Sequence, residues 1–201
     1  LVKEIIKSSG IEMVIVGPEN PLIDGVYDFI KADSEINHVS VIGPSQNGAQ
    51  LEGSKKFAKD FMSRNNIPTA SSKTFTKETF LDACDFIKKS SAPYVLKADG
   101  PAAGKGVVIL ENTEDAIAEL KSMLIDSKFG ESSKKVVIEE FLNGIEMSCF
   151  VIFDGKNYIT LPYAKDYKRI GEGDVGLNTG GMGSISPVSF INTAFEAETS
   201  R

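Results

Sequence analysis

A glycine-rich run with two lysines is the segment of this sequence best suited to hold a phosphate. The run KADGPAAGKG begins at Lys97, and Lys105 adds a second positive charge. Glycines let a backbone approach a ligand closely, and successive N–H groups can cradle phosphate oxygens. The run is not a Walker A loop, because Gly100 to Gly104 is one residue too short and Gly106 stands where Ser or Thr belongs. A strand pattern follows, which favours a β-hairpin lid over phosphates; a plain mobile turn is the alternative.

Three carboxylates near the end of a predicted strand could bind a nucleoside. The segment VIEEFLNGIE places Glu139, Glu140 and Glu146 beside apolar residues. A purine edge needs a backbone donor and acceptor, and ribose hydroxyls need a carboxylate. A strand that leads into a short connection offers both. The alternative is that Glu139 and Glu140 simply alternate between the two faces of a strand.

The segment DYKRIGEGDVGLNTGGMG, residues 166–183, is polar and rich in glycine. Lys and Arg favour phosphate or carboxylate ligands, and the glycines permit close backbone approach. The segment has no clear period, so we expect a long loop, which inside a compact domain is usually functional or disordered. Its charged and polar members are Asp166, Lys168, Arg169, Asp174, Asn178 and Thr179.

Composition excludes several classes of protein and of active site. The net charge of −6 argues against a general nucleic-acid binder. No apolar run approaches the ~20 residues that span a bilayer. His38 is the only histidine and precedes a predicted buried strand, so histidine triads and multi-histidine metal sites are excluded. Cys84 and Cys149 are too few for a disulfide framework, and we expect reduced core thiols and a cytoplasmic protein.

The first quarter of the chain predicts a βαβ unit. Residues 12–17 and 38–43 are short apolar runs that end in Gly and precede Pro, typical of buried parallel strands. Residues 21–32 between them have helical spacing with Pro at the start. Ligands of such units bind at the carboxyl ends of the strands. A charged helix is expected over residues 50–66, ending before Pro68.

Strands and helices are predicted to alternate through the rest of the chain. The helix from Thr113 has a possible cap at Asn112, and Asp154-Gly155 indicates a two-residue hairpin turn. The predicted strands are 73–75, 94–98, 106–110, 136–141, 146–153 and 158–161, and the predicted inward-facing helix residues are Phe80, Cys84, Ile87, Ile117, Leu120 and Leu124. The last twelve residues resemble a starting helix, and the chain begins with Leu1, so we expect a fragment of a longer protein.

Five segments in order resemble the phosphoribosylamine–glycine ligase family of ATP-grasp enzymes. The resemblance covers nearly the whole chain and fades after Pro187. KADG with GKG is common to several ATP-grasp ligases, whereas GPE-x-PL, the QLEGSK helix and NTGGMG are far more specific. The segments are GPENPLIDG (17–25), GPSQNGAQLEGSKKFAKDF (43–61), KADGPAAGKGV (97–107), VIEEFLNGIEMS (137–148) and DYKRIGEGDVGLNTGGMGSISP (166–187).

The resemblance implies an α/β fold that becomes α+β in the second half, with a Rossmann-like N-terminal portion followed by an ATP-grasp domain with a small lid subdomain. The implied boundaries are a partial Rossmann-like domain at 1–50, a connecting helix at 51–72, the lid at 73–142, and the truncated start of the ATP-grasp body at 143–201.

The resemblance also implies roles for individual residues. Lys97, Asp166 and Lys168 are the implied catalytic residues. The implied ATP-binding residues are Lys59, Lys97, Gly100, Gly104, Lys105, Gly106, Glu139, Glu140, Phe141, Leu142 and Glu146, with Glu139 to Leu142 at the adenine edge and Glu146 at the ribose. The implied substrate-binding residues are Gly17, Glu19, Pro21, Asn178, Thr179, Gly180, Gly181, Met182 and Gly183.

The implied reaction joins glycine to 5-phosphoribosylamine. The glycine carboxylate attacks the γ-phosphate of Mg-ATP to give glycyl phosphate and ADP, and the amine of phosphoribosylamine then attacks the glycyl carbonyl to form glycinamide ribonucleotide with release of phosphate. Such chemistry depends on positioning and charge neutralisation and needs no side-chain nucleophile. ATP and Mg²⁺ are the implied cofactors, with no nucleic-acid or membrane partner. The family's metal ligands are expected beyond Arg201, so we expect no metal ligand here and no activity from this chain alone; Tyr167 stands where the family often has histidine.

Three alternatives remain at this point. One is an ATP-grasp ligase that acts on bicarbonate or another carboxylic acid, against which GPENPL and NTGGMG speak. Another is a nucleotide-binding module without catalysis. The third is an α/β domain whose glycine-rich segments are only connections.

Overall fold

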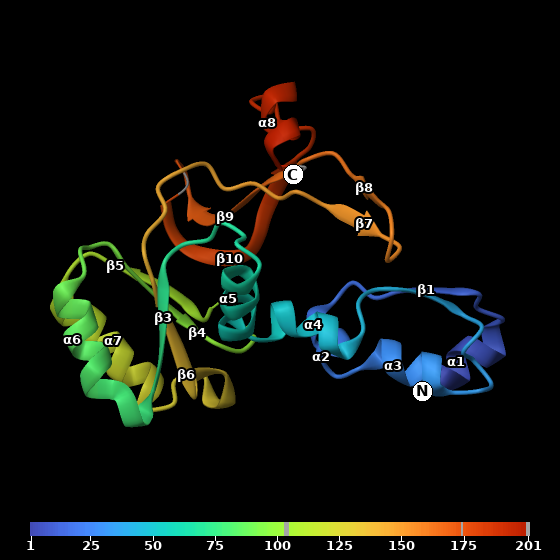
Figure 1. The fold of residues 1–201 in the computed structure, drawn as a ribbon, viewed down its shortest axis with the longest axis horizontal. Coiled ribbons are helices and arrows are strands. Elements are labelled where there is room, and N and C mark those ends of the chain that lie inside the picture. Colours follow the sequence, from blue (N-terminus) through green and yellow to red (C-terminus); the bar gives the residue numbers. More distant parts are fainter. Residues whose placement is uncertain (103–104, 174, 200–201) are drawn as a thin grey trace. The chain divides into compact units, whose positions relative to one another are not determined.

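A computed structural model describes residues 1–102, 105–173 and 175–199, with the exception of the side chains of Leu177 and Asn178. The chain divides into two compact units, Leu1–Phe141 and Leu142–Arg201 (Figure 1). The architecture is mixed α/β, with a parallel pair of strands near the N-terminus and antiparallel sheets after it, as predicted. Among the described residues, no helix has the length and apolar character that a membrane crossing requires.

The predicted strand–helix–strand order in the first quarter of the chain is confirmed. Strands β1 and β2 pair in parallel, and a small core of Ile6, Ile30, Ile36 and Val39 packs beside them. The elements are α1 (Val2–Ser9), β1 (Met13–Ile15), α2 (Glu19–Ile23), α3 (Val26–Ala32) and β2 (Ser40–Ile42).

Three expectations for this region were wrong in detail. The predicted helix 21–32 is two helices, because Gly25 adopts a left-handed conformation (φ 88°) between them. The strands are not buried on both faces: Val14 and Val41 pack on the small core, whereas Met13 is 55% and Ile15 72% exposed. His38 is exposed in a turn before β2 rather than held in a buried strand.

The predicted helix 50–66 is also two helices. Helix α4 (Gln46–Gly53) ends at Ser54, and α5 (Lys55–Arg64) begins there. Ser54 has extended backbone, and its hydroxyl oxygen accepts a hydrogen bond from the N–H of Phe57, which is an ordinary N-cap. This cap sets where α5 begins and therefore how its lysines are directed.

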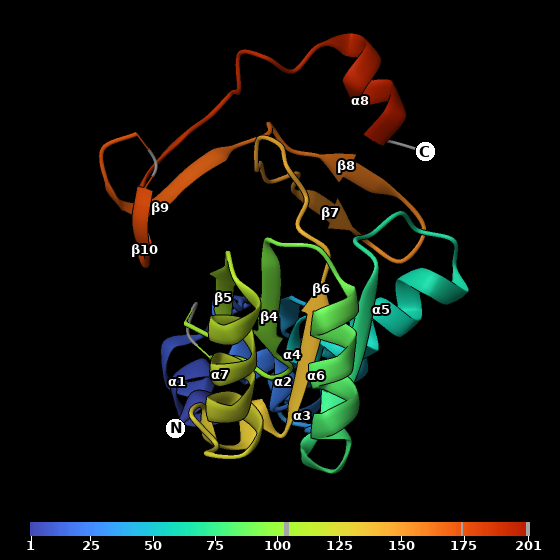
Figure 2. The same cartoon turned by 90° about the vertical axis from the view of Figure 1, so that its left-hand side faces the viewer.

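A four-stranded antiparallel sheet in the order β3-β6-β4-β5 follows. Figure 2 shows α6 and α7 side by side over one face of it. The prediction of the strands and of the capped helix is confirmed, since the Asn112 side chain accepts from the N–H of Asp115 at the start of α7. The elements are β3 (Ser72–Thr76), a 3₁₀ turn (Lys77–Thr79), α6 (Phe80–Lys89), β4 (Tyr94–Ala98), β5 (Val107–Leu110), α7 (Thr113–Leu124), a second 3₁₀ turn (Gly130–Ser133) and β6 (Lys135–Glu139).

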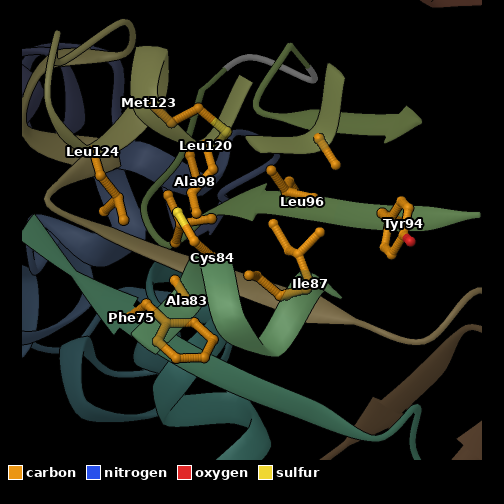
Figure 3. Packing of buried hydrophobic residues seen from close by; sticks show 13 residues of the cluster. Phe75, Ala83, Cys84, Ile87, Tyr94, Leu96, Ala98, Leu120, Met123 and Leu124 are labelled. Atoms are coloured by element: carbon orange, nitrogen blue, oxygen red, sulfur yellow. The ribbon is translucent and has the colours of Figure 1, made fainter. Parts of the chain in front are cut away.

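The main hydrophobic core lies between this sheet and its two helices. Figure 3 shows Cys84 and Ile87 of α6 and Leu120 of α7 converging on Leu96 of β4. The predicted inward faces of both helices are therefore confirmed. Because side chains alternate along a strand, residues 95, 97, 137 and 139 point to the opposite face of the sheet.

The second unit is built from two hairpins and a helix. Its elements are β7 (Val151–Phe153), β8 (Tyr158–Thr160), β9 (Lys165–Gly171), β10 (Val175–Ile185) and α8 (Thr193–Thr199). Strands β7 and β8 pair antiparallel, as do β9 and β10.

Four expectations for the second unit are corrected. The loop between β7 and β8 comprises residues 154–157 instead of a two-residue turn, and the Asp154 carboxylate accepts from the N–H groups of Lys156 and Asn157. The strand predicted from residue 146 begins only at Val151. Cys149 is exposed, so it is not a core thiol. The segment expected to be a long loop is the hairpin β9–β10.

Candidate functional site

Glu139 holds two lysines in the first unit. The Lys97 Nζ lies 2.7 Å from one carboxylate oxygen of Glu139, and the Lys59 Nζ lies 3.4 Å from the other. The Glu139 side chain is only 6% exposed. Strand β4, helix α5 and strand β6 each contribute one of these residues, so the tertiary fold assembles the cluster.

Strand pairing explains the contact between Lys97 and Glu139. Glu139 of β6 stands opposite Val95 of β4, and Lys97 lies two residues further along β4 on the same face. Such diagonal neighbours are within reach of long side chains. The face that carries them is opposite to the main hydrophobic core, and on it these charged side chains lie beside the buried Val95 and Val137.

Lys59 is already satisfied by the protein. Its ammonium donates to the Thr69 hydroxyl and to the Ala70 carbonyl, both at 2.8 Å, besides pairing with Glu139. An ammonium has three protons. Two of them are used in the bonds to Thr69 and Ala70, and the ammonium also forms the ion pair with Glu139, so the geometry favours a role for Lys59 in fixing α5 over a role in holding phosphate.

Lys55 is a lysine that sequence reasoning did not select for the site. It is half-buried one turn before Lys59, and burial lowers the pKa of its ammonium below the ordinary value. Lys97 and Glu139 both lie near enough to influence that pKa electrostatically. The four-residue spacing from Lys59, which puts both on one helix face, was the signal that could have identified it.

Asp99 joins the end of β4 to the start of α5. Its carboxylate accepts from the N–H of Lys56 at 2.7 Å and from the Ser54 hydroxyl at 3.1 and 3.0 Å. Its backbone carbonyl accepts from the N–H of Lys55 at 3.2 Å. Sequence reasoning did not select Asp99 either.

The glycine-rich run connects β4 to β5 as a hairpin. A Cβ on Gly100 would lie 2.9 Å from the Ser132 hydroxyl, and one on Gly106 would lie 2.8 Å from the Cβ of Ala102. Both glycines are therefore required by close packing at the two ends of the run, whatever it binds. Lys105 is exposed, and Gly104 lies outside the described residues.

The residues after β6 are open to solvent. The Glu140 carboxylate accepts hydrogen bonds from the hydroxyl and the N–H of Ser71, which hold the pKa of that carboxyl below its ordinary value. Phe141 is 40% and Leu142 63% exposed. Their backbone groups lie in a short connection beyond the strand, which is the kind of edge that a purine base could meet.

Gly17, Glu19 and Pro21 lie after the carboxyl end of β1. Gly17 and Glu19 are exposed, and a Cβ on Gly17 would meet nothing within 4 Å. The turn after β2 lies at the same edge because the two strands are parallel. The site residues of the N-terminal part are thus accessible and uncrowded.

Lys168 is the centre of a second charged cluster, within the second unit. Its Nζ lies 2.8 Å from Glu146 and 3.1 Å from Asp166. The hydrogen bond to Glu146 raises the pKa of the Lys168 ammonium, so this lysine is protonated throughout the neutral range. Glu146 was predicted at a ribose and Lys168 at the substrates; within this unit the two are bonded to each other.

The TGGM sequence forms a large bulge opposite Lys168. Asn178 pairs with Arg169 and Gly183 with Tyr167, which leaves residues 179–182 opposite Lys168 alone. The Thr179 hydroxyl donates to the Lys168 carbonyl at 2.8 Å and accepts from the N–H of Gly181. Gly180, Gly181 and Met182 are exposed on the bulge, Gly183 follows it, and the Asn178 side chain lies outside the described residues.

Tyr167 has a different setting from its two charged neighbours. By strand alternation it points to the face opposite to Asp166 and Lys168. The Lys165 Nζ lies 4.2 Å from the centre of its ring, a cation–π contact. The tyrosine therefore does not contribute to the Lys168 cluster.

Two family models match the chain. Residues 1–52 match the N domain of phosphoribosylglycinamide synthetase, and residues 53–200 match its ATP-grasp (A) domain. A phosphoribosylamine–glycine ligase of Pasteurella multocida is 46% identical over 185 residues, which cover 92% of this chain and 42% of that protein. One of Listeria monocytogenes is 46% identical over 188 residues, 94% of this chain and 43% of that protein.

A solved structure agrees with these matches. The crystal structure of a phosphoribosylamine–glycine ligase from Thermotoga maritima has a TM-score of 0.69 and 44% identity, and covers 76% of this chain and 38% of that chain. A biotin carboxylase from Campylobacter jejuni has a TM-score of 0.66 at 20% identity, which shows a shared fold alone. The chain spans about two fifths of the length of the Pasteurella and Listeria ligases.

Proposed function

Because this chain belongs to the phosphoribosylglycinamide synthetase family, we propose that it provides the N domain and part of the ATP-grasp domain of a ligase that joins glycine to 5-phosphoribosylamine at the expense of ATP. The observation that carries the proposal is the group of Lys55, Lys59 and Lys97 beside Glu139, on the face of the four-stranded sheet opposite to helices α6 and α7. A face with buried charge next to a glycine-rich hairpin is suited to a polyphosphate.

Lys97 and Lys55 are the proposed phosphate ligands. Lys97 forms an ion pair with one oxygen of Glu139, and as an ammonium it has further protons to donate. Lys55 is half-buried nearby, and the cost of burying its charge would be offset by an anionic ligand. Lys59 was predicted in the same role, but its contacts with Thr69, Ala70 and Glu139 favour a structural role in fixing α5.

The adenine and the ribose of ATP are proposed to bind at and after the end of β6. The backbone of Glu139 to Leu142 is proposed at the adenine edge, with Glu140 fixed by Ser71 beside it. Glu146 is proposed at the ribose hydroxyls. Gly100 to Gly106, with Lys105, is proposed to cover the phosphates. These roles rest on the family resemblance together with the exposure of these groups.

Glycine needs a site for its carboxylate and its ammonium, and phosphoribosylamine needs a site for its sugar, its phosphate and its amine. Asp166 and Lys168 offer one negative and one positive group at 3.1 Å, a suitable arrangement for the ammonium and carboxylate of glycine. The exposed bulge at 179–182 and the turn at Gly17, Glu19 and Pro21 are proposed for phosphoribosylamine. The chemistry then requires only orientation and charge neutralisation by these residues.

Magnesium enters this proposal as the partner of ATP in solution. The described residues contain no group of three His, Cys, Asp or Glu side chains that could hold a metal ion. We also propose the domain boundaries 1–50, 51–72, 73–142 and 143–201, a cytoplasmic location and inactivity of this chain alone.

The test measures ADP release in a longer protein, in which this chain is extended to the full length of its relatives. Mg-ATP and phosphoribosylamine are supplied with and without glycine, and Lys97→Ala is compared with Lys73→Ala. Lys73 is a strand lysine that contacts the rings of Phe75 and Phe86 and lies outside the cluster. We expect glycine-dependent release that Lys97→Ala abolishes and Lys73→Ala preserves. Release indifferent to glycine would indicate another ATP-grasp substrate, and tight ATP binding without release would indicate a binding module.

A further inference from the structure

Asp99 contacts both of the elements that carry the proposed phosphate ligands. It follows β4 directly, two residues after Lys97, and its own N–H donates to the Lys135 carbonyl of β6 at 3.0 Å. Its carboxylate and carbonyl accept from the first turn of α5, where Lys55 is the first residue. One residue is thus bonded to the sheet on one side and to the helix on the other.

The bonds satisfy the start of α5 completely. The first N–H groups of a helix have no partner within the helix and carry partial positive charge. Here the N–H of Lys55 donates to the Asp99 carbonyl, that of Lys56 to the Asp99 carboxylate, and that of Phe57 to the Ser54 hydroxyl. A carboxylate of the protein therefore occupies the end of this helix, where an external anion could otherwise bind.

Both oxygens of the Asp99 carboxylate have partners within the protein. One oxygen accepts from the N–H of Lys56, and the single proton of the Ser54 hydroxyl is shared between the two oxygens. These contacts direct the carboxylate into the junction between β4 and α5. An effect of Asp99 on a ligand would therefore act through the lysines on either side of it.

We propose that Asp99 is a positioning residue for the nucleotide site, which sets the spacing between Lys55 and Lys97 by fixing the first turn of α5 to the end of β4. The role rests on the proposed function, because those lysines are its proposed phosphate ligands. Lys55 is the first residue of α5 and has a long flexible side chain, so a loosened first turn would move its ammonium directly. Losing a charge-assisted hydrogen bond to a phosphate costs about 10-fold or more in affinity.

The test measures ATP affinity and amide exchange in the same set of variants. Asp99→Ala removes the carboxylate, whereas Asp99→Asn keeps an acceptor for Lys56 and a group that can bond Ser54. Asn112→Ala is the matched control, because Asn112 caps α7 by the same kind of side-chain bond to Asp115 and lies outside the lysine cluster. Calorimetry gives the dissociation constant for Mg-ATP, and NMR gives the exchange of the amides of residues 55–57.

We expect Asp99→Ala to weaken ATP binding by about 10-fold or more and to speed exchange at residues 55–57. The dissociation constant for Mg-ATP should stay within about 3-fold of the unsubstituted value in Asp99→Asn and within about 2-fold in Asn112→Ala, since neither change releases α5 from β4. If Asp99→Ala does not fold, Ser54→Ala carries the same expectation, because the Ser54 hydroxyl bonds both carboxylate oxygens.

Equal affinities for Asp99→Ala and Asn112→Ala would overturn the positioning role while leaving the proposed function intact, provided that Lys97→Ala still loses ATP. The positioning role would also be overturned if Asp99→Ala and Asn112→Ala both lost stability but Asp99→Ala showed no additional loss of ATP affinity. Asp99 would then be a helix cap only. The variants are made in the protein at the length of its relatives, and absence of ATP binding by that unsubstituted protein would overturn the proposed nucleotide site and the positioning role together.

Discussion

The ammonium of Lys97 lies 2.7 Å from a carboxylate oxygen of Glu139, and that glutamate is the least exposed member of the charged cluster. The pair joins two adjacent strands on the face of the sheet that the core helices do not cover. Its burial makes it costly to break, because removing one member of a buried pair leaves the other charge without compensation.

Glu139→Gln should destabilise the first unit by about 3 kcal/mol, since Lys59 and Lys97 then face each other without a negative charge between them. Denaturation in urea measures the change. Glu131→Gln is the control, because Glu131 pairs with Lys134 at the surface, where both side chains are largely exposed. That variant should change stability by less than about 0.5 kcal/mol. Equal effects in the two variants would contradict the burial argument.

Lys55→Met and Lys59→Met should separate affinity from stability. Lys55→Met should weaken ATP binding by about 10-fold or more with little change in stability, because a charge-assisted bond to phosphate is worth about 1.5–3 kcal/mol. Lys59→Met should chiefly lower stability, since it frees Thr69 and Ala70 from their shared donor. Calorimetric titration with ATP and urea denaturation give both quantities, and the reverse assignment would favour Lys59 as the phosphate ligand.

ATP affinity should fall at alkaline pH through Lys55. Desolvation lowers the pKa of this ammonium, so as pH rises it loses its proton before an ordinary lysine with a pKa of 10.5 does. Phosphate binding that needs the charged form is complete below the lowered pKa and declines as pH rises through it. Lys55→Arg stays charged over this range and should move the decline to higher pH. Identical pH profiles for the two proteins would exclude Lys55 as the titrating group.

Lys168→Met should abolish ligation without unfolding the protein. Lys168 and its partner Glu146 are both substantially exposed, so the pair contributes no more than about 1 kcal/mol to stability. Loss of a charge that orients a substrate should cost about 100-fold or more in glycine-dependent ADP release. Lys165→Met is the matched control from the opposite face of β9 and should retain most activity. A stability loss that accounts for the lost activity would contradict this assignment.

Elements with a strong local signal were predicted correctly from the sequence. Helix α7 has apolar residues at helical spacing and a capping Asn112, and both features act within a few residues of the chain. Strand β4 is a short apolar run between turn signals. In each case local preference and burial favour the same structure, so the sequence pattern alone was sufficient.

The errors occurred where a local pattern is interrupted or where distant segments meet. Gly25 and Ser54 each divide a helix whose apolar spacing continues across the break. The bulge at 179–182 removes the two-residue alternation that would have indicated a hairpin. The four-residue spacing of Lys55 from Lys59 indicates a shared helix face, but the contacts of Asp99 depend on how α5 packs against β4, which no spacing along the chain encodes.

The two faces of the β3–β6 sheet have a consequence for how this protein can evolve. One face carries the packed core, and the other carries the charged cluster, so the two sets of side chains alternate along the same strands. Within β4, Tyr94, Val95, Leu96 and Ala98 are all buried and preserve the fold, so Lys97 is the position whose substitution can alter ligand preference. Random mutagenesis of β4 should therefore show one tolerant position for folding, Lys97, at which selection for catalysis acts alone.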